Sequence, residues 1–421
     1  MIQRIFLIYK GLNSSREKLV NLFILQLIMA HYLCEGSMSK IYNILLMLGQ
    51  GIFIAYDITY FREAGLSLAL ITLASTGFDI SSSIMEIPTS LFFDRVSPRL
   101  TLALGNMLRL CGFLLFAFNP QNFWVVLVGQ VLTGIGSATE SGAASALYIN
   151  ERKEDESSFE KIMGEIQEFG SITYLVGGLV GAVAYRLSEK LIWLLPALIY
   201  VLATILLVKM PMNNTVNTVS SNAVRVRTLA REFMHIGAKT FKNIDWWMLL
   251  LVETGSLSMY LLWQVRLSGA DTTQVWNQFA GLIVMNSAGY IAGKLSQKIS
   301  LAHSFRLLSV IIINVVLCLA LAWTTGFWVG IILYLPHVIL LGWIQNMYAG
   351  ALHMSISDNE RATVFSLQAA AVACAAIIVG PACGWLTDSY GLGVGMTSTL
   401  FFFLIPIIHE IMRVLRDKRK K

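Results

Sequence analysis

Stretches of about twenty apolar residues, the length that a helix needs to cross a bilayer, recur along almost the whole chain. Of its 421 residues, 56% are hydrophobic and 13% are charged, whereas the charged share of a soluble domain is about 25%. A soluble core cannot hide so much apolar surface, so the chain is predicted to be an all-α integral membrane protein. The same composition excludes a disordered chain, a collagen-like repeat, a disulfide scaffold and a nucleic-acid-binding domain.

Twelve membrane spans are predicted, in two groups of six. They are Tyr42–Phe61, Leu70–Phe93, Leu100–Phe118, Phe123–Ile149, Ile162–Tyr185, Leu191–Val208, Trp246–Val265, Val275–Ala292, Phe305–Ala322, Gly326–Tyr348, Ala362–Thr387 and Val394–Met412. The expected domains are an N-terminal extension (1–41), a six-helix bundle (42–209), a linker (210–243), a second six-helix bundle (244–412) and a basic tail (413–421). Repeated halves of this kind place a substrate site between the bundles, near the membrane midplane.

Lysine and arginine are distributed unevenly between alternate loops. With the N-terminus inside, 26 of the 31 fall in inner segments, and four (Arg62, Arg186, Lys190 and Arg266) fall in outer loops; Arg109 lies inside a span. Because cytoplasmic loops are enriched in these residues, both termini are predicted to be cytoplasmic. The expected location is the cell membrane as a multi-pass protein, with a bacterial plasma or inner membrane favoured.

Two segments outside the spans allow more than one interpretation. Leu19–Cys34 is apolar but short and contains polar residues, so an interfacial helix is favoured over a thirteenth span or a signal anchor. Residues 223–243 have apolar residues near helical spacing and a basic remainder. A helix lying on an anionic inner leaflet and a solvated connector helix both fit this pattern.

Polar side chains recur at helical spacing along the first, fourth, seventh and tenth spans. Because a charged group at the centre of a bilayer costs about 2.5–3.5 kcal/mol, such stripes indicate a face turned to protein or water. The predicted substrate and proton cavity contains Asn43, Gln50, Asp57, Gln130, Ser137, Glu253, Tyr260, Gln264, Tyr334, His337 and Gln345. The alternative is that these groups fasten helices together.

Among these residues, the two acids Asp57 and Glu253 are the candidate proton carriers, because an acid within a span is a functional hypothesis by default. His337 fits either proton coupling or a neutral, hydrogen-bonded ring.

An arginine within the third span requires a partner, because an isolated buried charge is costly. Counting from the nearby turns, Glu86 and Glu140 lie at a depth similar to that of Arg109. The sequence therefore predicts a buried ion pair of Arg109 with Glu86 or Glu140. Such a pair is either fixed or broken during a transport cycle.

The loop between the second and third spans reads Ser90-Leu-Phe-Phe-Asp94-Arg95-Val-Ser97-Pro98-Arg99. It resembles the signature Gly-x-x-x-Asp-Arg-x-Gly-Arg-Arg of the major facilitator superfamily. Ser90 and Ser97 stand at the glycine positions, and Pro98 stands at the first arginine of the closing pair. The resemblance implies the fold of that superfamily, twelve transmembrane helices in two pseudo-symmetric six-helix bundles. It also implies that Asp94 meets the N-terminal end of span eleven, beside Arg361, in the outward-open state.

The leading functional interpretation is a secondary active transporter that moves a small organic solute by alternating access. The phosphate-binding pattern G-x-x-x-x-G-K-[ST] is absent, so an electrochemical gradient is expected to drive transport. Proton coupling is favoured, with sodium coupling and uniport as alternatives. Aromatic residues and few charges on the stripes favour export of an amphipathic or weakly cationic solute. Import of a nutrient or metabolite and a non-transporting sensor or scaffold are the alternatives.

Enzymatic activity is not expected, because the six histidines and five cysteines show no metal-ligand spacing and no nucleophile motif is present. No cofactor and no metal are predicted. The expected partners are a small-molecule substrate and the lipid bilayer, with no nucleic acid, and a monomer is expected.

Overall fold

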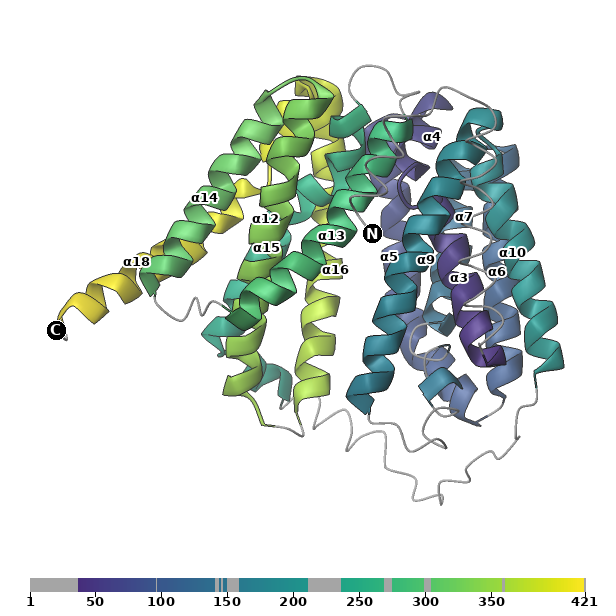
Figure 1. Ribbon diagram of the computed structural model, residues 1–421, viewed down its shortest axis with the longest axis horizontal. Coiled ribbons are helices and arrows are strands. Elements are labelled where there is room, and N and C mark those ends of the chain that lie inside the picture. The colour runs from purple at the N-terminus through teal and green to yellow at the C-terminus, as the bar shows by residue number, and fades with distance from the viewer. Residues whose placement is uncertain are drawn as a thin grey trace.

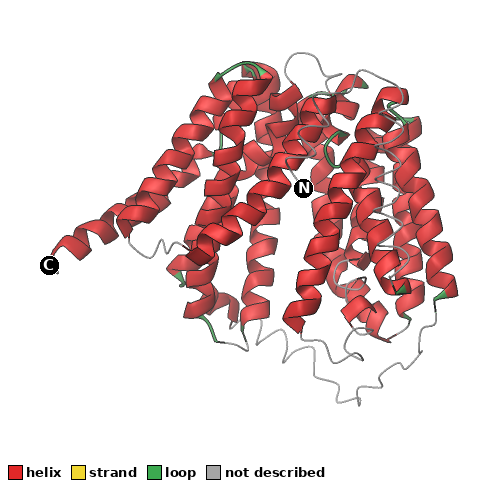
Figure 2. Ribbon diagram, viewed as in Figure 1, coloured by secondary structure: helices red, strands yellow, loops and turns green. Residues whose placement is uncertain are grey.

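The structure is a computed structural model that describes residues 37–95, 97–140, 144, 147–149, 159–210, 236–268, 275–298, 304–357 and 360–419. Figure 1 shows the helices of these residues gathered into two bundles, one from each half of the chain. Figure 2 shows that the described residues are helices and short loops, without a β-strand. The segment Leu19–Cys34 and residues 211–235 of the linker lie outside the described residues.

The N-terminal bundle consists of α3 (Met38–Phe53), α4 (Asp57–Glu63), α5 (Leu68–Arg95), α6 (Pro98–Phe118), α7 (Phe123–Glu140), α9 (Phe159–Leu187) and α10 (Leu191–Lys209). The C-terminal bundle consists of α12 (Ile244–Ser268), α13 (Val275–Lys298), α14 (Ser304–Trp323), α15 (Phe327–Ser355), α16 (Arg361–Tyr390), α17 (Leu392–Thr397), the 3₁₀ turn η1 (Leu400–Phe403) and α18 (Leu404–Arg419). We call the end of the bundles where α10 stops and α12 starts the linker end, and the opposite end the far end.

The helices follow the predicted spans closely. In the described residues, ten helices are long and apolar enough to cross a membrane, and the bent pair α3–α4 makes eleven. The remaining predicted span corresponds to α13, which has 24 residues and a more polar composition. The all-helical membrane fold is thereby confirmed, and twelve spans are consistent with it.

Helix starts in the N-terminal bundle are set by short polar residues. The side chain of Ser97 accepts a hydrogen bond from the backbone nitrogen of Leu100 at 3.3 Å, and Pro98 is the first residue of α6. Serine at the cap and proline at the first helical position are both favoured there. Ser97 and Pro98, which differ from the superfamily signature, therefore form the start of α6.

Close helix contacts in the N-terminal bundle depend on glycine. A Cβ atom on Gly177 of α9 would lie 2.8 Å from the Cα of Gly51 of α3, so neither position has room for a side chain. Small residues of this kind let helix backbones approach closely within a membrane.

An aromatic cluster packs the same bundle. Around Trp193, which is 1% exposed, Phe113 and Phe116 pack with ring centroids 5.9 and 4.7 Å from the tryptophan ring.

Three details differ from the sequence-based expectations. The first span is bent by 42° between α3 and α4. The last span, predicted as Val394–Met412, is broken into α17, η1 and α18, and Figure 1 shows α18 leaving the bundle toward the C-terminus. Arg266, placed by the sequence in an outer loop, instead lies in the last turn of α12 and is 4% exposed.

Candidate functional site

A break in the first span brings backbone and side-chain acceptors to the interface between the bundles. Because α3 stops at Phe53 and α4 starts at Asp57, the carbonyl of Ile54 is available to a partner from outside its own helix. Gln264 of α12 donates through Nε2 to Ile54 O at 3.0 Å and to Asp57 Oδ1 at 2.9 Å. The Ile58 backbone nitrogen also donates to Asp57 Oδ1, at 2.9 Å. Asp57 of the N-terminal bundle and Gln264 of the C-terminal bundle, both predicted cavity residues, are thus in direct contact.

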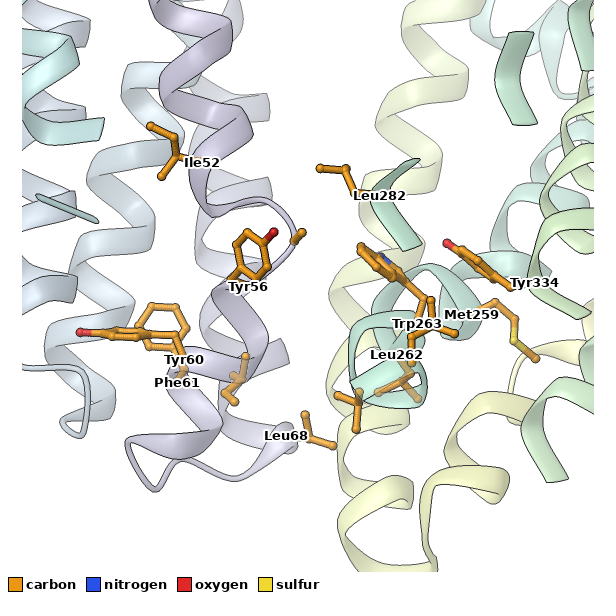
Figure 3. Packing of buried hydrophobic residues seen from close by; sticks show 14 of the residues in the cluster. Ile52, Tyr56, Tyr60, Phe61, Leu68, Met259, Leu262, Trp263, Leu282 and Tyr334 are labelled. Atoms are coloured by element: carbon orange, nitrogen blue, oxygen red, sulfur yellow. The ribbon is translucent and has the colours of Figure 1, made fainter. Parts of the chain in front are cut away.

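A second polar contact lies close by. Gln278, in the first turns of α13, donates through Nε2 to the hydroxyl of Thr59 in α4; the two residues are 0% and 1% exposed. Next to it, the side chain of Leu282 packs against Gly178 of α9, where an added Cβ atom would require the leucine to shift. Figure 3 shows Tyr56 on one side of this interface, facing Leu282 and Trp263 on the other.

A buried charge network lies within the N-terminal bundle. Arg109 Nε is 2.8 Å from Glu140 Oε1, and the two side chains are 4% and 7% exposed. Glu140 Oε2 accepts hydrogen bonds from Gln50 Nε2 at 3.1 Å and from the hydroxyl of Tyr200 at 3.3 Å. Of the two partners that the sequence allowed for Arg109, the structure has Glu140, whereas Glu86 is an exposed residue.

The network reaches the inter-bundle side through Gln50. The hydroxyl of Tyr174 on α9 donates to Gln50 Oε1 at 2.5 Å. Both Gln50 and Tyr174 are half-buried, whereas Arg109 and Glu140 are buried behind them. Across the interface, Tyr260 of α12 is 60% exposed, which makes it the most accessible of the predicted cavity residues. The Arg109–Glu140 pair is therefore more buried than the Gln50 amide and the Tyr174 hydroxyl that complete the network.

The second acid of the predicted cavity has a partner of its own. Glu253 on α12 is half-buried, and its Oε2 accepts a hydrogen bond from Gln368 Nε2 of α16 at 2.7 Å. Glu253 and Tyr260 are seven residues apart on one helix, so they lie on one face. In the described residues, no group of three His, Cys, Asp or Glu side chains is arranged to hold a metal ion.

Other predicted cavity residues are buried inside a bundle. Tyr334 is 3% exposed and stacks on Trp263, with ring centroids 6.1 Å apart. His337 is 2% exposed, and its Nδ1 lies 2.9 Å from Asn314 Oδ1 and 3.2 Å from Cys318 Sγ. Neither residue faces open space in this conformation. For His337 the arrangement matches the hydrogen-bonded ring that the sequence allowed.

Asn43 joins helices within the N-terminal bundle, because its Nδ2 donates to Ser39 O at 2.9 Å and to Ala144 O at 2.8 Å. Gln130, Ser137 and Gln345 are half-buried. The predicted cavity residues thus include Asn43, which fastens helices within one bundle, and Asp57 and Gln264, which bind each other across the two bundles.

The signature segment is described only in part. Arg99 donates through one guanidinium nitrogen to Met210 O at 2.6 Å, so it connects the start of α6 to the end of α10. The side chains of Ser90, Asp94, Arg95 and Arg361 lie outside the described part of the structure.

Three residues of these hydrogen-bonded contacts were not selected from the sequence. Tyr174, Gln278 and Gln368 each donate a hydrogen bond to a predicted residue or across the interface. Gln368 had one sequence signal, the recurrence of an acidic–basic–glutamine pattern near the starts of spans five and eleven. Tyr174 and Gln278 belong to spans with no polar stripe of their own, and the contact of Gln278 depends on how the two bundles meet.

Two helical bundles of membrane-crossing length, meeting around polar side chains, define a polytopic membrane protein with a central interface of the kind that transporters use. Residues 41–381 match the family described as the Major Facilitator Superfamily. The chain belongs to this superfamily of membrane transporters.

Solved structures support the fold at low sequence identity. The nucleoside transporter NupG is 14% identical, with a TM-score of 0.71 over 89% of this chain and 97% of that one. A D-xylose–proton symporter is 14% identical, with a TM-score of 0.60 over 86% and 96% of the two chains. A POT family transporter in complex with 5-aminolevulinic acid is 10% identical, with a TM-score of 0.63 over 90% and 95%. No curated protein matches the sequence.

Proposed function

We propose that the protein is a secondary active transporter that moves a small organic solute by alternating access between its two bundles. The observation that carries the proposal is the position of the inter-bundle hydrogen bonds. Gln264 meets Asp57 and Gln278 meets Thr59 near the far end of the molecule. In the described residues these bonds join the two bundles at the far end, and their exchange for contacts at the other end would give the solute access to each side in turn.

The charge asymmetry of the sequence supports an orientation with the linker end in the cytoplasm. In that orientation, this conformation is closed toward the outside. We place the protein in the cell membrane, with a bacterial inner membrane as its expected location, and we propose that it acts as a monomer.

Proton coupling is proposed to act through Asp57. As a carboxylate, Asp57 accepts hydrogen bonds from Gln264 of the other bundle and from its own helix backbone. Protonation would remove the negative charge and weaken both bonds, because bonds to an ionised acceptor are roughly twice as strong as neutral ones. Loading a proton would therefore loosen the outer contact. Glu253 is the second carrier candidate, because its partner Gln368 is also a neutral amide.

The solute is proposed to be amphipathic or weakly cationic, and the direction to be export. Tyr260, Tyr174 and Gln50 present hydroxyl, amide and aromatic surface between the bundles, and the acids Asp57 and Glu253 favour a cation over an anion. Proton-coupled import of a nutrient is the second candidate, because one protein of similar fold is a D-xylose–proton symporter.

The experiment is a thermal-stability screen of the purified protein against nucleosides, sugars, amino acids and lipophilic amines, followed by counterflow of every stabilising compound in proteoliposomes. We expect a lipophilic amine to stabilise the protein and to exchange across the membrane. Counterflow of a sugar or nucleoside instead would support import. A compound that stabilises without any counterflow would contradict transport and favour a sensor of the same fold.

A further inference from the structure

A carboxylate of the C-terminal bundle binds the N-terminal end of a helix in the N-terminal bundle. Asp388 lies near the end of α16, at the far end of the molecule. Its Oδ1 accepts a hydrogen bond from the backbone nitrogen of Leu68 at 3.3 Å, and its Oδ2 accepts one from that of Ala69 at 2.9 Å. These two residues are the first two of α5.

The contact completes the cap of α5. The first backbone nitrogens of a helix have no partner within the helix and need one from outside. The third of them, on Leu70, donates to Ser67 Oγ at 3.3 Å, so the local sequence supplies one acceptor. Asp388 supplies the other two, and its negative charge lies at the positive end of the helix dipole.

The backbones of the two helices also approach one another closely at this point. A Cβ atom on Gly384 of α16 would lie 2.6 Å from both Leu68 O and Thr72 Oγ1. Gly384 is one helical turn before Asp388, so the same face of α16 supplies the glycine and the acid. This close approach holds the carboxylate over the first turn of α5.

We propose that Asp388 is a gating residue that holds the far end of the transporter closed, a proposal that rests on the alternating-access function above. The superfamily signature implies that Asp94, near the other end of α5, meets the start of α16 when the protein is open outward. The Asp388 contact is the converse arrangement of the same two helices, at the opposite end. Opening the far end separates α5 from α16 and so breaks this cap.

The test measures distances between spin labels at the far end, in detergent and without solute or pH gradient. Labels are attached to Lys190→Cys in the N-terminal bundle and Thr325→Cys in the C-terminal bundle, which are exposed positions away from the contact. Cys34, Cys111 and Cys374 are replaced by alanine to prevent labelling elsewhere. The variants are Asp388→Asn and Asp388→Lys, with Glu189→Gln and Glu189→Lys as controls that change an exposed far-end charge without any inter-bundle bond.

Removing a carboxylate from a helix N-terminus changes the equilibrium constant between the bound and separated states by about two- to fivefold. Asp388→Asn is therefore expected to raise the ratio of long to short distances by about that factor, and Asp388→Lys by more, because a cation then faces the positive helix end. The Glu189 controls are expected to match the parent protein. Unchanged distances in both Asp388 variants, or equal changes in the controls, would overturn the proposal. Since the readout needs no solute, altered distances in a protein that fails to transport would uphold the gate and contradict only the transport function.

Discussion

Two arginines show how a single buried cation is accommodated in this fold. Arg109 is matched by the carboxylate of Glu140. Arg266 instead donates to neutral oxygens at the corner between α14 and α15, namely Leu321 O at 2.7 Å, Thr324 Oγ1 at 3.2 Å and Gly326 O at 3.4 Å. The planar fork of a guanidinium suits both solutions. Of these two sites, the one around Arg109 contains an acid, Glu140, that a mutation can neutralise.

Glu140→Gln is expected to destabilise the protein strongly, because it leaves the charge of Arg109 buried without compensation. Removing one partner of a buried pair costs about 3–5 kcal/mol, so we expect a large decrease in the thermal unfolding temperature in detergent. Glu86→Gln, at an exposed position on α5, serves as the control and is expected to leave that temperature unchanged. Equal unfolding temperatures for the two variants would contradict a stabilising role for the pair.

Part of the candidate site could be predicted from single residues. An arginine inside a span requires an acid, and an acid inside a span requires a donor, so Arg109, Asp57 and Glu253 were identifiable. Asp388 and Gln278 were not, because their partners are more than two hundred residues away in sequence. Their roles depend on the relative position of the bundles, which hydropathy does not determine.

Individual helices follow from hydropathy more directly than their bends do. The predicted span positions agree with the helices of the structure because the bilayer sets the length of each apolar run. The break at residues 54–56 could not be predicted, because the helix there contains no proline. The side chain that binds the freed carbonyl of Ile54 is Gln264, which belongs to the other bundle. The amphipathic α18 was likewise predicted only as the end of an apolar run.

The end of the linker is attached to α16 by an ion pair outside the membrane-spanning part. Lys239 Nζ donates to Glu360 Oε2 at 2.6 Å, immediately before the first residue of α16. This hydrogen bond lowers the pKa of Glu360 below the usual value for glutamate. Because the folded-state pKa is lowered, the attachment is present at neutral pH and is lost as the pH falls through that lowered pKa.

Lys239→Gln is therefore expected to speed hydrogen exchange of the amides in residues 236–243 at pH 7. The difference from the parent protein should vanish as the pH falls below the lowered pKa of Glu360, because both proteins then lack the ion pair. Lys242→Gln, which removes an exposed charge nearby, is the matched control. A difference that persists in acid would contradict the assignment to this pair.

The two bundles together are closed at the far end, where Asp57, Thr59 and the start of α5 each bind the C-terminal bundle. These contacts join α4 to α12, α4 to α13, and α5 to α16. Polar groups thus contribute to the interface at this end, and the proposed alternating access would require them to exchange partners.

The proposed orientation places the linker on the cytoplasmic side. A protease site inserted at Asn217 is expected to be cleaved in inside-out membrane vesicles and to be protected in right-side-out vesicles, because of the positive charges on linker-side segments. A site inserted at Ser188, between α9 and α10, is the control, with the reverse pattern expected. Cleavage of the linker in right-side-out vesicles would reverse the assignment of the closed end.

The most direct test of proton-coupled transport uses proteoliposomes with a pH-sensitive dye inside and the compound from the stability screen outside. For the parent protein we predict that adding the compound moves protons across the membrane, and that an ionophore abolishes the signal. We predict that Asp57→Asn loses this proton movement and retains counterflow of the compound. Proton movement at the parental rate in both Asp57→Asn and Glu253→Gln would contradict the account.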